Sequence, residues 1–188
     1  VYNLEDALLT GGFLNSLMRQ SERVRVGCIA QIVNVIAPLM TNATSVLRQT
    51  IYYPYAWALK HARGHVLHLQ VESETYPIRA EGLRADFARD EQVPFLDVVA
   101  TRDPKTGQVA VFMLNRDLDS ERDLSIDLGD RAATRVISYE TITGRDLKAA
   151  NTFAQPNNVV PQRLEPPKAG SRMTFRLPPR SYTLAVLG

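Results

Sequence analysis

An unbroken apolar run over residues 26–38 constrains the fold of this chain more than any other feature. It reads VGCIAQIVNVIAP, and two amides, Gln31 and Asn34, interrupt its second half. Continuous apolar runs are typical of parallel strands covered on both faces, and in β/α barrels the polar groups at the carboxyl ends of the strands line the catalytic cleft. Because a helical pattern lies on either side, the run predicts the last strand of a parallel barrel, ending at an active site.

The length of the chain limits how much of such a barrel it can form. It has 188 residues, of which 45% are hydrophobic. That is enough for one or two small cores but too short for a full barrel of about 250 residues. The sequence begins at Val1, and no charged segment precedes an apolar one as in a signal peptide. We therefore expect the downstream part of a longer or cleaved polypeptide, whose upstream segment supplies the rest of the barrel.

Charge and cysteine content argue against several kinds of partner. The 22 basic and 20 acidic side chains are interspersed, so nothing in the sequence attracts nucleic acid strongly. The longest apolar stretch is too short to span a bilayer, which predicts no membrane partner. The single cysteine, Cys28, excludes an intrachain disulfide and suits a reducing, cytoplasmic compartment. Its apolar neighbours predict an inert thiol in the core.

Two helical patterns flank the apolar run. Asn3 can cap the first helix, and Glu5 and Asp6 lie in its first turn, where carboxylates interact favourably with the helix dipole. Gly11 and Gly12 interrupt this pattern, each at a cost of about 1 kcal/mol relative to alanine. Close packing of the helix on a sheet would offset that cost.

The second helix is expected over residues 51–62, with Gly64 as its stop. Its aromatic side chains can stack on sugars, but on the outer helix of a barrel packing against a sheet is the favoured interpretation. Three histidines lie across the junction that follows, where their directions diverge, and this disfavours a metal site. The aromatic residues are Tyr52, Tyr53, Tyr55 and Trp57, and the histidines are His61, His65 and His68.

From His65 onward the hydrophobic period is two, which predicts an all-β half built as a sandwich of short strands. Residues 103–107 have hairpin-turn chemistry, with Gly107 at a positive φ. Residues 151–169 are interpreted as a long ordered loop held by apolar anchors. The expected strands span residues 65–71, 95–100, 109–114, 124–128, 173–177 and 182–186, and the anchors are Phe153, Val159, Val160 and Leu164.

Six distinctive segments occur in order along nearly the whole chain. They are YNLEDAL (residues 2–8), AQIVNVIAPLMT (30–41), RQTIYYP (48–54), TGQVAVF (106–112), DLKAANTF (146–153) and LPPRSY (177–182). Together they resemble the C-terminal part of glycoside hydrolase family 51, the α-L-arabinofuranosidases.

This resemblance implies the last β/α elements of a (β/α)8 barrel in residues 1–63, followed by a jelly-roll β-sandwich in residues 64–188. It also implies an exo-acting enzyme that releases terminal arabinofuranosyl groups, as in arabinan degradation, with retention of configuration. Retaining chemistry uses two carboxyls about 5–5.5 Å apart, one as acid/base and one as nucleophile. In the family both are glutamates that precede the position of Val1, so no catalytic residue is expected in this chain. Glu5 fits the first turn of a helix instead.

The resemblance assigns one site residue to this chain. Gln31 resembles the family's glutamine that hydrogen-bonds the arabinose where cleavage occurs, and an amide can both donate to and accept from a sugar. The residues alone favour a buried glutamine satisfied by backbone groups. Asn34 can shape the cleft, but capping a turn before Pro38 is favoured.

The resemblance also implies which molecules accompany the chain. The partners are the upstream segment with the two glutamates, an arabinose-containing saccharide and further copies in a homo-oligomer, commonly a hexamer in the family. No cofactor and no metal are expected. The contrasting hypothesis is a noncatalytic carbohydrate-binding or structural β-sandwich onto which the N-terminal helices merely dock.

Overall fold

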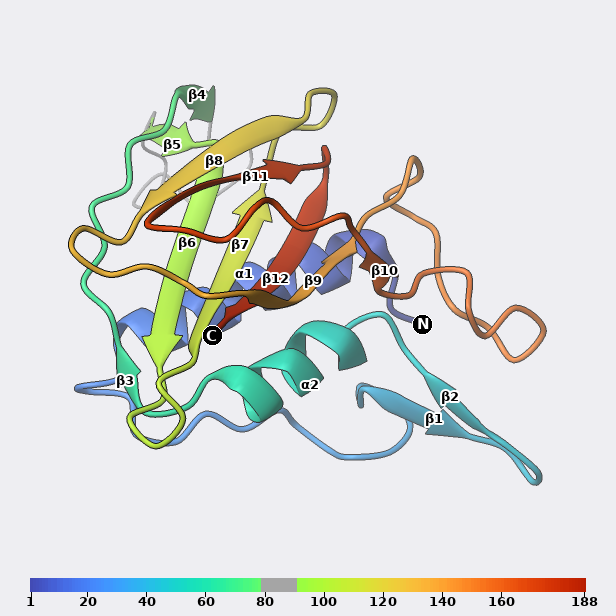
Figure 1. Ribbon diagram of the computed structural model, residues 1–188. Helices are drawn as coiled ribbons and strands as arrows, with labels where there is room; N and C mark the ends of the chain where they lie inside the picture. Colours follow the sequence, from blue (N-terminus) through green and yellow to red (C-terminus); the bar gives the residue numbers. More distant parts are fainter. Residues whose placement is uncertain (79–90) are drawn as a thin grey trace.

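The fold is organised around one antiparallel sheet. The computed structural model describes residues 1–78 and 91–188. Six strands form the sheet in the order β10-β9-β12-β7-β6-β3 (Figure 1), and every neighbouring pair is antiparallel. The strands are β3 (His65–Val66), β6 (Leu96–Arg102), β7 (Val109–Asn115), β9 (Val136–Ile142), β10 (Gln162–Arg163) and β12 (Ser181–Leu187).

Both faces of this sheet are covered. The helices α1 (Leu4–Arg19) and α2 (Tyr52–His61) pack on one face, where Phe112 and Leu184 belong to a core that also includes Leu4 and Trp57. The antiparallel pair β8 (Arg122–Asp127) and β11 (Arg172–Leu177) covers the other face (Figure 1). The predicted all-β half is therefore confirmed as a mostly-sheet domain, and its central strands are buried on both sides.

The first helix forms as the sequence predicts. The Asn3 side chain accepts a hydrogen bond from the Asp6 N–H (3.1 Å), and the Asp6 carboxylate accepts one from the Asn3 N–H (2.8 Å). Gly11 and Gly12 do not interrupt the helix, which runs unbroken over them. A Cβ at Gly11 would lie 2.5 Å from the ring of Tyr182 on β12. Close packing of this helix on a sheet is thus confirmed as the role of Gly11.

Several predictions for the second half are confirmed. Gly107 has a φ of +75°, and its N–H donates to the Asp103 carbonyl (2.8 Å), which closes the hairpin between β6 and β7. Gly64, just past α2, has a φ of +77°, and a Cβ there would lie 2.2 Å from the Arg102 carbonyl oxygen. Of the predicted loop anchors, Val159 is buried, Val160 and Leu164 pack against the cores, and Phe153 is exposed.

Other parts of the predicted sheet differ. Only His65 and Val66 of the expected strand 65–71 pair as a strand, with β6. The strand β9 was not expected; it pairs with β12 on one side and with β10 on the other. Two small hairpins complete the fold. They are β1 (Leu39–Thr41) with β2 (Val46–Arg48), and β4 (Thr75–Ile78) with β5 (Glu91–Pro94).

The predicted barrel strand does not form among the described residues and stays a prediction. Residues 26–36, called the exposed segment below, form no strand, and the one bridge within them joins Val33 to Leu39. Val26, Ile32 and Val35 are 78%, 76% and 76% exposed. A parallel strand needs hydrogen-bonding neighbours along its length, and among the described residues this segment has only that single bridge, so its backbone stays irregular.

Two further predictions concern this segment and the helices beside it. Cys28 is exposed, so the predicted placement of its thiol in the core is wrong. The helices expected to belong to a barrel instead share a hydrophobic core with the sheet, across the predicted domain boundary at residues 63 and 64. That boundary and the barrel itself stay predictions. Within the described residues no helix is both long and apolar enough to cross a membrane.

Candidate substrate-binding edge

Gln31, the predicted substrate-binding residue, lies in the exposed segment between α1 and β1. Its backbone is left-handed, with a φ of 61°, and its side chain is exposed. The amide forms no hydrogen bond with the residues that the structure describes. The alternative of a buried glutamine satisfied by backbone groups therefore does not hold, and the amide is free to reach a ligand.

Asn34 closes a turn three residues further on. Its Oδ1 accepts from the Thr41 N–H (2.7 Å), and its Nδ2 donates to Thr41 Oγ1 (3.1 Å). Its backbone N–H donates to the Leu39 carbonyl (2.7 Å), while its carbonyl accepts from the Ala37 N–H (3.0 Å). The interpretation of Asn34 as the residue that caps a turn at Pro38 is confirmed.

Beyond this turn the chain becomes fixed. Ala37 and Pro38 are buried, and both of their carbonyls accept hydrogen bonds from Gln49. The Gln49 side chain donates to the Ala37 carbonyl (2.6 Å) and accepts from the Tyr2 N–H (2.9 Å). The Tyr2 hydroxyl donates to the Ile36 carbonyl (2.9 Å). The exposed segment is thus free at Gln31, and the chain is anchored just past the end of this segment, at Ala37 and Pro38.

A loop of the sheet domain holds the elements around Gln49. Asn151, which is fully buried, donates to the carbonyls of Arg48 (3.0 Å) and Val159 (2.9 Å) and accepts from the Val159 N–H (2.7 Å). The start of α1 is tied to the same loop, because the Leu4 N–H donates to the Ala149 carbonyl (2.8 Å).

Glu5 lies where the sequence predicts, in the first turn of α1. Its carboxylate forms an ion pair with Lys148 of the same loop, and this interaction raises the pKa of the lysine. Its N–H donates to the Leu147 carbonyl (3.0 Å). Glu5 therefore helps to join α1 to the sheet domain.

The aromatic helix packs inward, as predicted. Trp57 is buried and stacks on Tyr182, with 6.1 Å between ring centroids. Tyr53 is buried too, and this burial raises the pKa of its hydroxyl. Neither ring is available as a platform for a sugar.

The three histidines lie on different elements. His61 ends α2 and is half-buried, and burial lowers the pKa of its imidazole. His65 lies in β3, and His68 lies in the irregular stretch that follows it; both are exposed. Residues 1–78 and 91–188 contain no group of three or more His, Cys, Asp or Glu side chains that could hold a metal ion.

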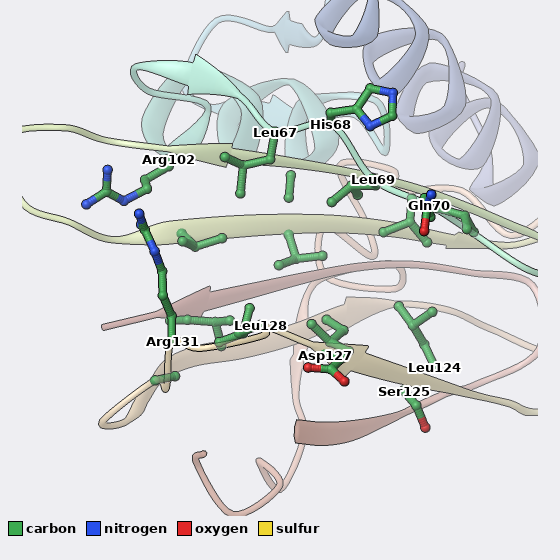
Figure 2. A pocket seen from close by; sticks show the side chains of 18 of the residues that line it. Leu67, His68, Leu69, Gln70, Arg102, Leu124, Ser125, Asp127, Leu128 and Arg131 are labelled. Atoms are coloured by element: carbon green, nitrogen blue, oxygen red, sulfur yellow. The ribbon is translucent and has the colours of Figure 1, made fainter. Parts of the chain in front are cut away.

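A concave region lies between the six-stranded sheet and the β8–β11 pair, away from Gln31. It is an open groove of about 1420 Å³ (Figure 2). Leu67 and Leu69 face Leu124 and Leu128 across it, with charged groups such as Arg102 and Arg131 at its margin. No Phe, Tyr or Trp side chain of the described residues lines the groove. Since sugar-binding faces commonly use aromatic rings, this groove is the open edge of a sheet core and a poor carbohydrate platform.

Comparisons with known proteins give a consistent family. The model of the alpha-L-arabinofuranosidase C-terminal domain matches residues 1–181. An intracellular exo-alpha-(1→5)-L-arabinofuranosidase of Streptomyces lividans is 34% identical over 183 residues, which are 96% of this chain and 26% of the relative. An exo-alpha-(1→6)-L-arabinofuranosidase of Bifidobacterium longum is 34% identical over 162 residues, or 85% of this chain and 29% of the relative.

Solved structures agree with these relatives. A family 51 alpha-L-arabinofuranosidase from Bifidobacterium longum superposes with a TM-score of 0.87 at 30% identity, covering 100% of this chain and 36% of the other. The GH51 enzyme of Thermotoga petrophila has the same fold, with a TM-score of 0.81 at 23% identity, covering 100% of this chain and 39% of that chain. The chain thus spans about a quarter to two-fifths of the length of these proteins.

The sequence analysis did not identify Gln49 or Asn151 as the residues whose side-chain amides anchor the chain next to the exposed segment. Both lie in segments that carry the family resemblance, RQTIYYP and DLKAANTF. An amide inside an otherwise apolar or aromatic context is the available signal, because buried polar groups must find hydrogen-bond partners. Their partners are distant, since Asn151 and Arg48 are 103 residues apart in sequence.

Proposed function

The chain belongs to the alpha-L-arabinofuranosidase C-terminal domain family, and we propose that it is the C-terminal part of a retaining, exo-acting α-L-arabinofuranosidase. The observation that carries this proposal is the family match over residues 1–181 in a chain that covers only 26% of a named exo-arabinofuranosidase. The remaining length of such a relative is where the two catalytic glutamates would lie. The substrate class is a saccharide with terminal arabinofuranosyl groups.

The surface of this chain supports an upstream partner segment. The exposed segment presents Val26, Ile32 and Val35 to solvent, and Leu9 and Phe13 project from the outer face of α1. Residues four apart on a helix share a face, so Leu9 and Phe13 form one apolar strip. Large exposed apolar patches mark interaction sites, and an upstream β/α barrel would bury both regions by pairing the exposed segment as its last strand.

Within that assembly, Gln31 would contact the substrate. Its side chain is unpaired and exposed, and an amide can donate to one sugar oxygen while it accepts from a hydroxyl. The glutamates would supply the chemistry, with one carboxylate attacking the anomeric carbon and one carboxylic acid protonating the leaving oxygen. Gln31 would hold the sugar in place for this displacement and strengthen its hydrogen bond as charge develops.

The alternative, a noncatalytic carbohydrate-binding module, has less support. The groove between the sheets is aliphatic, and the aromatic side chains of α2 at Tyr53 and Trp57 are buried. A cytoplasmic location agrees with relatives that are named intracellular. A homo-oligomer, including the hexamer common in the family, stays a prediction.

Substitution of Gln31 in the complete polypeptide tests the proposal. Gln31→Ala should lower kcat/KM for an aryl α-L-arabinofuranoside by about 30- to 150-fold, equivalent to about 2–3 kcal/mol. The melting temperature should barely change, because the side chain is exposed and forms no hydrogen bond with the described residues. Product analysis by NMR should show the retained anomer first.

The isolated chain provides the control. Residues 1–188 alone should hydrolyse no aryl arabinofuranoside, whereas the complete polypeptide should. Hydrolysis by the isolated chain would contradict the proposal that the upstream segment supplies the catalytic glutamates. Unchanged kcat/KM in Gln31→Ala would contradict the proposal that Gln31 contacts the substrate.

A further inference from the structure

We propose that Gln49 is a positioning residue, whose buried amide fixes the point from which the segment carrying Gln31 emerges. This inference rests on the proposed function, because it assumes that Gln31 contacts the substrate. It gives the sheet domain a role in catalysis, namely to hold one edge of the substrate site at a set position.

Both polar atoms of the Gln49 side-chain amide form hydrogen bonds. The residue is 0% exposed. Its Nε2 donates to the Ala37 carbonyl (2.6 Å), and its Oε1 accepts from the Tyr2 N–H (2.9 Å). Its own N–H donates to the Pro38 carbonyl (2.9 Å). One side chain therefore ties the chain ahead of α1 to the chain ahead of β1.

These hydrogen bonds lie just past the end of the exposed segment. Ala37 is buried, while every residue of the exposed segment except Ile29 is exposed. The Gln49 contact thus marks the boundary between the fixed chain and the free chain. Tyr2 reinforces this boundary through its hydroxyl, which donates to the Ile36 carbonyl (2.9 Å).

Only a short stretch of chain separates Ala37 from Gln31, and hydrogen bonds restrain it. The turn closed by Asn34 spans most of it, with bonds to Ala37 (3.0 Å), Leu39 (2.7 Å) and Thr41 (2.7 Å). A displacement of the Ala37 carbonyl would therefore move the turn and, with it, Gln31. In enzymes a displacement of about 1 Å in a substrate-contacting group can cost about 100-fold in rate.

The neighbours of Gln49 in the chain are themselves held by hydrogen bonds. Asn151 donates to the carbonyl of Arg48, the residue before Gln49 (3.0 Å). Thr50, the residue after it, donates from Oγ1 to the Asn3 carbonyl (2.5 Å). The position of Gln49 is therefore set from both sides, by the loop that follows β9 and by the cap of α1.

A double-mutant cycle in the complete enzyme tests this coupling. Gln49→Met keeps the length of the side chain but removes its donor and its acceptor. It should lower kcat/KM for an aryl α-L-arabinofuranoside by about 10-fold, as expected for a misplaced contact. In a Gln31→Ala background the same change should cost less than about 2-fold, because residues that act through one another are not additive.

Met173→Ala is the matched control for stability. Met173 is buried in the core on the opposite face of the sheet, away from Gln49. It should lower the melting temperature and leave kcat/KM unchanged at temperatures where the enzyme is folded. If Gln49→Met fails to fold, Tyr2→Phe replaces it, since this change removes only the hydrogen bond to Ile36; about a 2- to 5-fold loss is expected, again absent with Gln31→Ala.

The outcomes separate the two proposals. If Gln31→Ala lowers kcat/KM but Gln49→Met and Tyr2→Phe change only the melting temperature, the positioning role is overturned and the proposed function stands. Equal losses in both backgrounds would also overturn it. If Gln31→Ala itself has no effect, both proposals fall.

Discussion

The central strand β7 and the exposed segment have similar apolar sequences and opposite environments. β7 reads VAVFMLN and is paired on one side with β6 and on the other with β12. The exposed segment reads VGCIAQIVNVI and forms only one isolated bridge, from Val33 to Leu39, among the described residues. Burial of an apolar strand therefore requires partners for its backbone as well as a face to pack on, because unpaired N–H and C=O groups are costly away from water.

The largest expected contrast is between one side chain from each region. Phe112 of β7 is 0% exposed, so Phe112→Ala in the isolated chain should lower the free energy of unfolding by about 3–5 kcal/mol. Ile32 is 76% exposed, and Ile32→Ala should change that free energy by less than about 0.5 kcal/mol. Urea denaturation followed by circular dichroism measures both. Comparable losses would show that the exposed segment is packed in the isolated chain.

A second pair of variants tests how closely the buried region is packed. At Gly11 a Cβ would lie 2.5 Å from the Tyr182 ring, whereas at Gly12 it would lie 3.1 Å from the side chain of Leu114. Gly11→Ala should therefore cost about 1–3 kcal/mol. Gly12→Ala should be near neutral, since about 1 kcal/mol of helix propensity offsets its milder contact. Equal melting temperatures for the two variants would contradict this account of the helix–sheet contact.

The smallest expected effect is a dependence of stability on alkaline pH to which a buried tyrosine contributes. Burial raises the pKa of Tyr139 to about 12, while its hydroxyl donates to the Arg176 carbonyl. The native state therefore holds this proton more tightly than the unfolded state, whose tyrosine pKa is about 10. The resulting stabilisation is present below pH 10 and is lost as the pH rises toward 12.

Tyr139→Phe should weaken this pH dependence without abolishing it, because burial also raises the pKa of Tyr182. Melting temperatures recorded across the alkaline range would reveal the difference. Identical pH profiles for the variant and the wild-type chain would show that Tyr139 does not contribute to the pH dependence of stability.

The same contrast explains which parts of the fold could be predicted from sequence. The cap at Asn3 and the turn at Gly107 depend on neighbours within a few residues, so local patterns sufficed. The strand β9 was missed because its sequence, VISYETI, mixes polar and apolar residues without clean alternation. Its place in the sheet comes from pairing with β12, which lies far along the chain.

The candidate site was predictable only in part. The assignment of Gln31 rests on the resemblance and stays a prediction, whereas local chemistry identified the turn at Asn34. The burial of Gln49 and Asn151 depends on carbonyls 12 and 103 residues away, which no local pattern reveals. The predicted burial of the exposed segment is not seen for a related reason. An apolar run forms a buried strand only where neighbouring strands pair with it.

We propose that the exposed segment becomes the last barrel strand when the upstream segment is present. Amide hydrogen exchange of residues 26–36, compared between the isolated chain and the complete polypeptide, tests it most directly. The account predicts rapid exchange in the isolated chain and strong protection in the complete polypeptide, while β7 is protected in both. Equally rapid exchange of residues 26–36 in the two proteins would contradict the claim.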